Sequence, residues 1–273
     1  MARTAVDEAR FRDALAAIDA GDIAALERSL EADPELARDR LPGGEGYFRD
    51  PYLLWFVAEN PVRTGRLPAN IGEVARTILR AAGSAARDQA EYALGLAASG
   101  RVPRESGVQR ELIDVLVDAG ADPNTAMNAA AAHGEGDAVR HLMARGARLT
   151  LQAAVCVERD SDIDRIWSHS SPDDRRAALI VAALGGRAPT VRQLIALGAE
   201  VNGYGPPGFH AHATPLHDAT SSGSLDTVTA LVEAGADTTV RDRVYDGTPL
   251  EWAEHLRHGE IAAFLRARGA DGD

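Results

Sequence analysis

Residues 214–219 read TPLHDA and residues 248–253 read TPLEWA, so that the two segments start 34 positions apart. The short segment GAD, at residues 235–237 and again at 269–271, keeps the same 34-residue spacing. Self-similarity at a fixed period of roughly 20 to 50 residues is the signature of a repeat architecture. The sequence from residue 214 to residue 271 therefore predicts stacked copies of one structural unit.

Each copy has the chemistry of a helix start followed by a helix end. The hydroxyl of Thr214 is suited to accept hydrogen bonds from the free N–H groups of the first helical turn. Pro215 then takes the first helical position, where its missing N–H costs nothing. The glycine of GAD favours the left-handed conformation that closes a helix. Two helices of roughly 8 to 10 residues cannot bury their apolar faces alone, so we expect neighbouring copies to stack.

These motifs resemble those of the ankyrin-repeat family, whose units recur about every 33 residues. Similar unit endings stand upstream, at residues 120–124, 146–147 and 198–202. The resemblance implies an all-α fold, a solenoid of stacked helix pairs with short β-turn fingers. It implies a single solenoid over residues 1–273 that begins with a capping helix pair. The pair is expected at residues 10–34 and the repeats at about 50–83, 88–122, 125–147, 149–170, 177–200, 213–237 and 248–271.

The earlier repeats depart from the family pattern and are degenerate. Equivalent positions in the middle of the chain, Gly120, Gly146, Ser170 and Gly198, are 26, 24 and 28 residues apart, which leaves no room for a protruding finger. The segment 202–213 (NGYGPPGFHAHA) is in contrast rich in Gly and Pro, and we expect a loop there.

The repeats before residue 83 match the family only weakly. In the first of them, the spacing of the later units places helices at Tyr52–Asn60 and Asn70–Ala82. The register of this part of the chain stays open.

Charge and composition restrict the possible partners. Asp and Glu outnumber Lys and Arg by 41 to 29, which gives a net charge of −12. An acidic surface repels phosphate backbones and argues against nucleic acid as a partner. The basic residues are all arginine, and with the frequent Ala, Gly and Asp this suggests a bacterial, GC-rich genome. Cys156 is the only cysteine, so no disulfide is expected within the chain.

The sequence also bears on location. Residues Met1 to Arg12 carry mixed charges and lack the apolar segment of a signal peptide. No apolar run approaches the roughly 20 residues that span a bilayer. We therefore expect no membrane association and a cytoplasmic location.

The sequence lacks the common motifs for catalysis or cofactor binding. There is no phosphate-binding loop, no dinucleotide fingerprint, no HExxH and no GxSxG, so no cofactor is expected. A metal site is not expected either. His210 and His212 could join Asp218 as ligands, but two histidines do not make a site. His217 matches the histidine that hydrogen-bonds between units in the ankyrin family.

The resemblance also implies a binding groove, because the first helix of each ankyrin unit lines a concave face. The middle of the predicted groove has an apolar floor formed by Cys156, Val157, Val181 and Leu184. Polar side chains flank this floor, namely His133, Asp218, Ser221 and His255. An apolar concavity with a few polar groups is typical of a small-molecule or peptide-side-chain site. The simpler alternative is that these side chains pack on one another.

Aromatic residues add further candidates near the fingers. Tyr245 lies at the expected tip of the last finger, where the family often contacts partners. Tyr204, Phe209 and His210 lie on segment 202–213, which could act as a lid. Trp252 has either a core role or a binding role, since aromatic rings bury a large area in both settings.

Three functional hypotheses follow. The favoured one is a binding and interaction module that recognises a protein partner through its groove and fingers. The alternative is a small-molecule binding protein, or a cofactor-independent acid–base isomerase, cyclase or hydrolase, with an apolar pocket near Val157, Val181 and Asp218. In an enzyme, Asp218 with His133 or His255 would be the acid–base groups. A purely structural role is the third.

Overall fold

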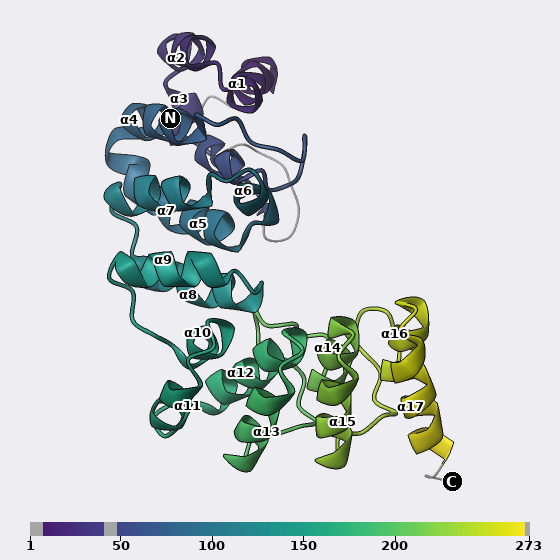
Figure 1. Cartoon of the computed structure of the whole chain (residues 1–273). Helices are drawn as coiled ribbons and strands as arrows, with labels where there is room; N and C mark the ends of the chain where they lie inside the picture. Colours follow the sequence, from purple (N-terminus) through teal and green to yellow (C-terminus); the bar gives the residue numbers. More distant parts are fainter. Residues whose placement is uncertain (1–7, 41–47, 271–273) are drawn as a thin grey trace, which may run out of the picture. The chain divides into compact units, whose positions relative to one another are not determined.

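The computed structural model describes residues 8–40 and 48–270. These residues form helices joined by loops, without a strand among them, which confirms the all-α prediction. They fall into two compact units, residues 1–148 and residues 149–273 (Figure 1). Residues 1–7 of the Met1 to Arg12 segment and residue 271 of the last expected repeat lie outside the described residues. The single solenoid over 1–273 and its repeat boundaries stay a prediction.

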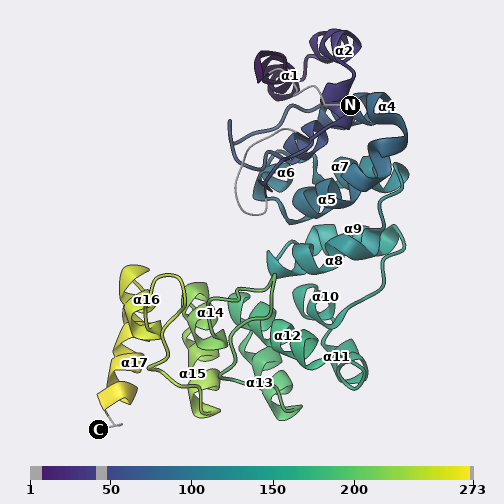
Figure 2. The same cartoon turned by 180° about the vertical axis from the view of Figure 1, so that it is seen from behind.

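Unit 1 arranges its helices in two rows (Figures 1 and 2). The short helix η2 contacts α5, which contacts α8, and behind them α4 contacts α7, which contacts α9. At the start of the rows, α1 packs on η2 and α2 packs on α4. The elements are α1 (Glu8–Ala20), α2 (Ile23–Ala32), α3 (Glu35–Arg38), η2 (Leu53–Ala58), α4 (Ile71–Ala82), η3 (Gly83–Ala85), α5 (Ala86–Ser99), α6 (Arg101–Glu105), α7 (Gln109–Asp118), α8 (Pro123–Ala132) and α9 (Gly136–Ala144).

The first repeat differs from its prediction in one helix. The second expected helix is present as α4, but the first, predicted over residues 52–60, is only a six-residue 3-10 helix, η2. All six side chains of η2 are buried, and the chain leaves it at Glu59 in the left-handed conformation. Glu59 thus closes the helix two residues before Pro61, whose missing N–H would itself prevent a helix from continuing through that position.

Unit 2 stacks four helix pairs within the described residues, and it contains both TPL segments. In the first row α10, α12, α14 and α16 contact one another in order, and in the second row α13 contacts α15, which contacts α17. The elements are α10 (Leu151–Cys156), α11 (Asp160–Trp167), α12 (Pro172–Leu184), α13 (Ala188–Ala196), α14 (Pro215–Ser222), α15 (Leu225–Glu233), α16 (Pro249–His255) and α17 (Gly259–Ala270).

The TPL segments start α14 and α16, as predicted. At α16, the hydroxyl of Thr248 accepts the N–H of Glu251 at 3.2 Å, and the Glu251 carboxylate accepts the N–H of Thr248 at 2.7 Å. This reciprocal pair satisfies two N–H groups that the helix itself leaves free. The cap fixes where α16 begins and hence where its side chains point.

At α14, a histidine replaces the glutamate of this cap. His217 Nδ1 accepts the N–H of Thr214 at 3.3 Å, which leaves the proton on Nε2. Nε2 lies 3.0 Å from the carbonyl oxygen of Gly247 and donates to it. Burial lowers the pKa of His217 and keeps the ring neutral. The side chain therefore joins α14 to the loop of the following repeat, as the family resemblance implies.

Candidate functional site

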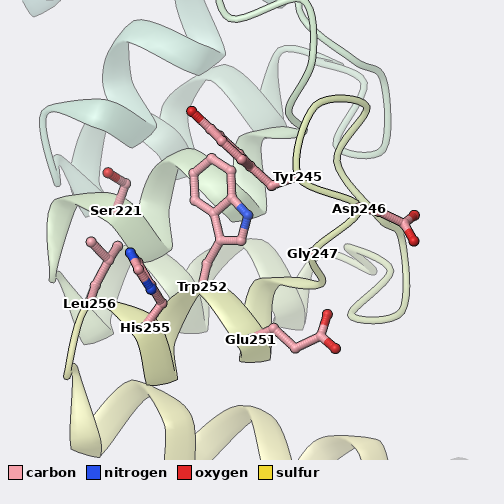
Figure 3. Close-up of a pocket in the computed structure, with 8 residues that line it drawn as sticks. All are labelled: Ser221, Tyr245, Asp246, Gly247, Glu251, Trp252, His255 and Leu256. Carbon is pink, nitrogen blue, oxygen red and sulfur yellow. The ribbon is translucent and has the colours of Figure 1, made fainter.

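Unit 2 has a cavity of about 650 Å³ beside α14, α16 and the loop that precedes α16 (Figure 3). We call residues 241–247 of this loop the short finger and residues 202–213 the long finger. The residues that line the cavity are Ser221, Tyr245, Asp246, Gly247, Glu251, Trp252, His255 and Leu256.

One buried carboxylate, that of Asp242, holds the short finger in place. Asp242 is 3 % exposed, and its Oδ1 accepts the N–H groups of Val244 at 2.9 Å and Tyr245 at 2.7 Å. Its Oδ2 accepts the N–H of Gly247 and the indole N–H of Trp252, each at 2.9 Å. Burial raises the pKa of a carboxyl, but these four donors outweigh it and hold the pKa of Asp242 well below its usual range. Ionised Asp242 therefore fixes both the tip of the finger and the indole ring.

Two aromatic rings form a corner of the cavity. The ring centroids of Tyr245 and Trp252 are 6.5 Å apart, and the ring planes meet at 67°. Tyr245 is 75 % exposed and Trp252 is half-buried. Figure 3 shows Leu256 and Ser221 on the far side of the indole from Asp246. The corner is open to solvent and exposes apolar ring surface.

Two carboxylates lie on the other side of the indole of Trp252, those of Asp246 and Glu251 (Figure 3). The guanidinium of Arg241 lies 3.2 Å from the Glu251 carboxylate and 3.9 Å from that of Asp246. The N–H of Thr248, with help from Arg241, lowers the pKa of Glu251. The Asp246 side chain is 86 % exposed. One arginine thus faces two carboxylates, and this rim of the cavity keeps a net negative charge.

The long finger is anchored on α14 by an imidazole–carboxylate pair. His210 Nδ1 lies 2.8 Å from Oδ1 of Asp218, which is fully buried. The second oxygen, Oδ2, is buried without a hydrogen-bond partner in the described part of the chain. Burial raises the pKa of Asp218, and the bond to Asp218 raises the pKa of His210. The pair therefore binds a proton more tightly in the folded chain than the separate groups do in water.

The two fingers are bonded to each other. The hydroxyl of Tyr204 donates to the carbonyl oxygen of Arg241 at 2.7 Å. The backbone N–H of Arg243 donates to the carbonyl oxygen of His212 at 2.8 Å. The guanidinium of Arg243 covers the Tyr204 ring at 3.7 Å, and the His212 ring lies 6.2 Å from that of Trp252. These contacts join the cavity and both fingers into one surface. We call it the two-finger face; it consists of residues 202–213, residues 241–247 and the other cavity-lining residues, which are Ser221, Glu251, Trp252, His255 and Leu256.

Several predicted site residues lie together on this face. Tyr245, Trp252, Ser221 and His255 all line the cavity. The three candidates for a lid belong to the long finger, where Tyr204 bonds the short finger, Phe209 is buried and His210 bonds Asp218.

Other predicted site residues lie elsewhere. Cys156, Val157 and Val181 are 7, 8 and 6 % exposed, and Leu184 is half-buried. This burial favours the alternative in which they pack against neighbouring side chains. His133 is exposed directly after α8, in unit 1. Asp218 belongs to unit 2, and its carboxylate is paired with the imidazole of His210.

Sequence reasoning missed Asp242. A signal for Asp242 was present, because aspartate side chains often bond the backbone N–H two residues later in a turn. The glycine at position 247 marks the end of that turn. The bond from Asp242 to an indole ten residues further on had no such signal.

Among the described residues, no three His, Cys, Asp or Glu side chains are grouped so that they could hold a metal ion. Within residues 8–40 and 48–270, no helix combines the length and the apolar character needed to cross a membrane.

Comparison with known proteins supports the repeat assignment. Residues 151–242 match the family model described as ankyrin repeats (3 copies). The rat protein named cyclin-dependent kinase 4 inhibitor B is 33% identical over 124 residues, which cover 35% of this chain and 95% of the relative. The chain belongs to the ankyrin-repeat family. Its ankyrin repeats make it an all-α solenoid protein and a protein-interaction module.

Other relatives match over shorter stretches of the ankyrin chain. The human cyclin-dependent kinase inhibitor 2A is 35% identical over 98 residues, which cover 36% of this chain and 60% of the relative. The bovine cyclin-dependent kinase 4 inhibitor B is 42% identical over 57 residues, which cover 21% of this chain and 43% of the relative. The chain thus spans about half the length of these two relatives.

Proposed function

We propose that this ankyrin-repeat chain binds a protein partner on the two-finger face of unit 2. The observation that carries the proposal is where the exposed apolar side chains lie. In the described residues the large apolar side chains that are exposed are Val62, Val244, Tyr245 and Leu256, at 61, 63, 75 and 40 %. Three of these four belong to the two-finger face. Apolar groups gathered in one exposed patch with a polar rim are typical of a protein-interaction site.

The contacts beneath the face support the same proposal. Asp242 fixes the short finger through four donors, and His210 fixes the long finger on Asp218. A surface that is ordered before binding loses less conformational entropy when a partner docks. Tyrosine and tryptophan are the residue types that most often contribute large binding energies at interfaces. We therefore assign the anchoring contacts to Tyr245 and Trp252.

The names of the relatives suggest the class of partner to test first. Three of them are called inhibitors of cyclin-dependent kinases, so a protein kinase is the first class of partner that we propose. A bacterial source and a cytoplasmic location stay predictions from the sequence.

The small-molecule alternative has less support. It required an apolar pocket near Val157, Val181 and Asp218, and these side chains are only 8, 6 and 0 % exposed. The described cavity lies instead beside Trp252 and Tyr245, at the base of the exposed finger tip.

The proposal is tested with peptides selected from a random display library on the immobilised full chain. Each recovered peptide is synthesised, and its Kd is measured for the wild type and for Tyr245→Ala, Leu256→Ser and Val62→Ser. All three positions are exposed, so the fold is expected to persist, and circular dichroism verifies it. Val62→Ser is the matched control, because it removes from unit 1 an apolar side chain whose exposure, 61 %, lies between those of Tyr245 and Leu256.

We expect Tyr245→Ala and Leu256→Ser to weaken peptide binding about tenfold each, which corresponds to about 1.4 kcal/mol. Val62→Ser should leave the Kd unchanged. Peptides that bind all four proteins equally, or that lose affinity only for Val62→Ser, would show that the partner binds elsewhere.

A further inference from the structure

We propose that the two-finger face takes an arginine side chain of the partner, stacked in the corner formed by Trp252 and Tyr245. The proposal rests on the proposed function and names the chemistry of the partner segment, which is basic. Its first support comes from how this chain uses arginine elsewhere.

In this protein, aromatic rings are regularly covered by arginine. Arg40 lies 5.2 Å from the ring of Trp55, and Arg175 lies 4.9 Å from that of Trp167. The third tryptophan, Trp252, has no arginine over its ring among the described residues. The same is true of Tyr245, its neighbour in the corner, across the described part of the chain. The pair, which the ring of His212 contacts but no arginine of the described residues covers, also lines the cavity, where a partner can reach it.

The indole of Trp252 is well prepared to attract a cation. Its N–H donates to the ionised carboxylate of Asp242 at 2.9 Å. A hydrogen bond to an anion pushes electron density into the ring, and tryptophan already has the strongest cation–π attraction of the aromatic residues. No arginine nitrogen of the described residues lies within 4.0 Å of the Asp242 carboxylate, so its charge is balanced only by N–H donors.

The charge around the corner is negative, which also favours a cationic side chain. The exposed carboxylates of Asp246 and Glu251 share a single guanidinium, that of Arg241. Asp242, at the N–H edge of the indole ring, adds a third carboxylate, and no arginine nitrogen of the described residues lies within 4.0 Å of it. The whole chain carries −12, so a basic segment is attracted from a distance as well as on contact.

The shape of the site suits arginine in particular. Its planar guanidinium stacks on aromatic rings and at the same time offers N–H groups to carboxylates. Figure 3 shows the Trp252 ring with Glu251 on one side and Leu256 on the other. A guanidinium on the ring can thus face the carboxylate while its aliphatic stem lies along Leu256. The cavity of about 650 Å³ has room for one such side chain.

The test uses three blocked amino acids, of which one is charged and two are neutral; citrulline matches arginine in size and leucine is smaller and apolar. N-acetyl-arginine methylamide, its citrulline analogue and its leucine analogue are titrated to millimolar concentration into the ¹⁵N-labelled full chain. Citrulline keeps the planar shape of arginine and removes its charge. The indole N–H signals of the three tryptophans are followed, and that of Trp252 is assigned with Trp252→Phe.

We expect the arginine probe to shift the Trp252 signal at least threefold more than the citrulline or leucine probe at equal concentration. The signals of Trp55 and Trp167 serve as internal controls and should stay in place. Asp246→Asn should reduce the shift, whereas Asp226→Asn, an exposed carboxylate on α15, should not.

Three results would overturn the inference: an equal shift with citrulline, a larger shift with leucine, or no shift of Trp252 with arginine. The peptide selection is independent of this titration. Selected peptides that need Tyr245 and Leu256 but bind equally well with arginine replaced by citrulline would leave the proposed function standing and remove this inference alone.

Discussion

Replacing Asp242 by asparagine should loosen the short finger, because four donors converge on its carboxylate. An asparagine side chain has one acceptor oxygen, and with this oxygen at Val244 and Tyr245 its amide group faces the N–H groups of Gly247 and Trp252. Two hydrogen bonds to a charged acceptor are then lost, and each contributes about 1.5–3 kcal/mol. Because the finger lies at the surface and can relax, we expect Asp242→Asn to lower the free energy of unfolding by about 2–3 kcal/mol.

The matched control is Asp246→Asn in the same finger. Its carboxylate is 86 % exposed and its nearest arginine is 3.9 Å away, so this change should cost less than about 0.5 kcal/mol. Both variants and the wild type are unfolded with urea at neutral pH, and unfolding is followed by tryptophan fluorescence and circular dichroism.

The pH dependence gives a second readout. The folded pKa of Asp242 is lowered, so its contribution is present above the unfolded pKa, about 3.9, and is lost as the pH falls below it. The difference in the free energy of unfolding between the wild type and Asp242→Asn should therefore become smaller as the pH is lowered from about 5 to 3. The reasoning would be refuted if Asp242→Asn were as stable as Asp246→Asn, or if the difference in the free energy of unfolding did not change with pH.

Three further predictions concern the long finger and a helix of unit 1. The His210–Asp218 pair binds a proton more tightly when folded, so its contribution is full below the unfolded pKa of histidine, about 6.5, and is lost as the pH rises through the raised pKa of His210. The Tm of the wild type should thus fall more between pH 6 and 8.5 than that of Asp218→Asn; parallel curves would contradict this. Gly205→Ala should lower the Tm, because the added Cβ would meet the carbonyl oxygen of Phe209 at 1.8 Å, and an unchanged Tm would show that the loop adapts. Gly95→Ala, inside α5 with nothing within 4 Å of the new Cβ, should raise stability by about 0.5–1 kcal/mol in the same urea assay, and a loss would disprove it.

The sequence predicted the fold best where the helix signals are local. The TPL segments start α14 and α16 because the capping threonine, the proline and the third residue of the cap lie within four positions of one another. The first repeat shows the limit of such reasoning. The helix expected over residues 52–60 is only a six-residue 3-10 helix over residues 53–58, all of whose side chains are buried.

The site was predicted only in part. The finger position of Tyr245 and the groove position of Trp252 follow from the repeat register, and both side chains line the cavity. The hydrogen bonds that hold these two side chains in place do not follow from the register. Asp242 accepts the indole N–H of Trp252 across a turn whose shape the sequence does not determine. His210 reaches Asp218 from a loop in which its own backbone is left-handed, with φ at 44°. Spacing alone could not reveal that pairing.

The most direct test of the two-finger face is photocrosslinking from its tip. Benzoylphenylalanine is placed at position 245 or, as a control, at position 62. Among the described residues these are the most exposed large apolar positions of unit 2 and unit 1, at 75 and 61 %. Each protein is irradiated with a peptide recovered in the selection and analysed by mass spectrometry. We predict a crosslinked product from position 245 and none from position 62. Crosslinking from position 62 alone, or from neither position at saturating peptide, would contradict the assignment of this face as the partner-binding surface.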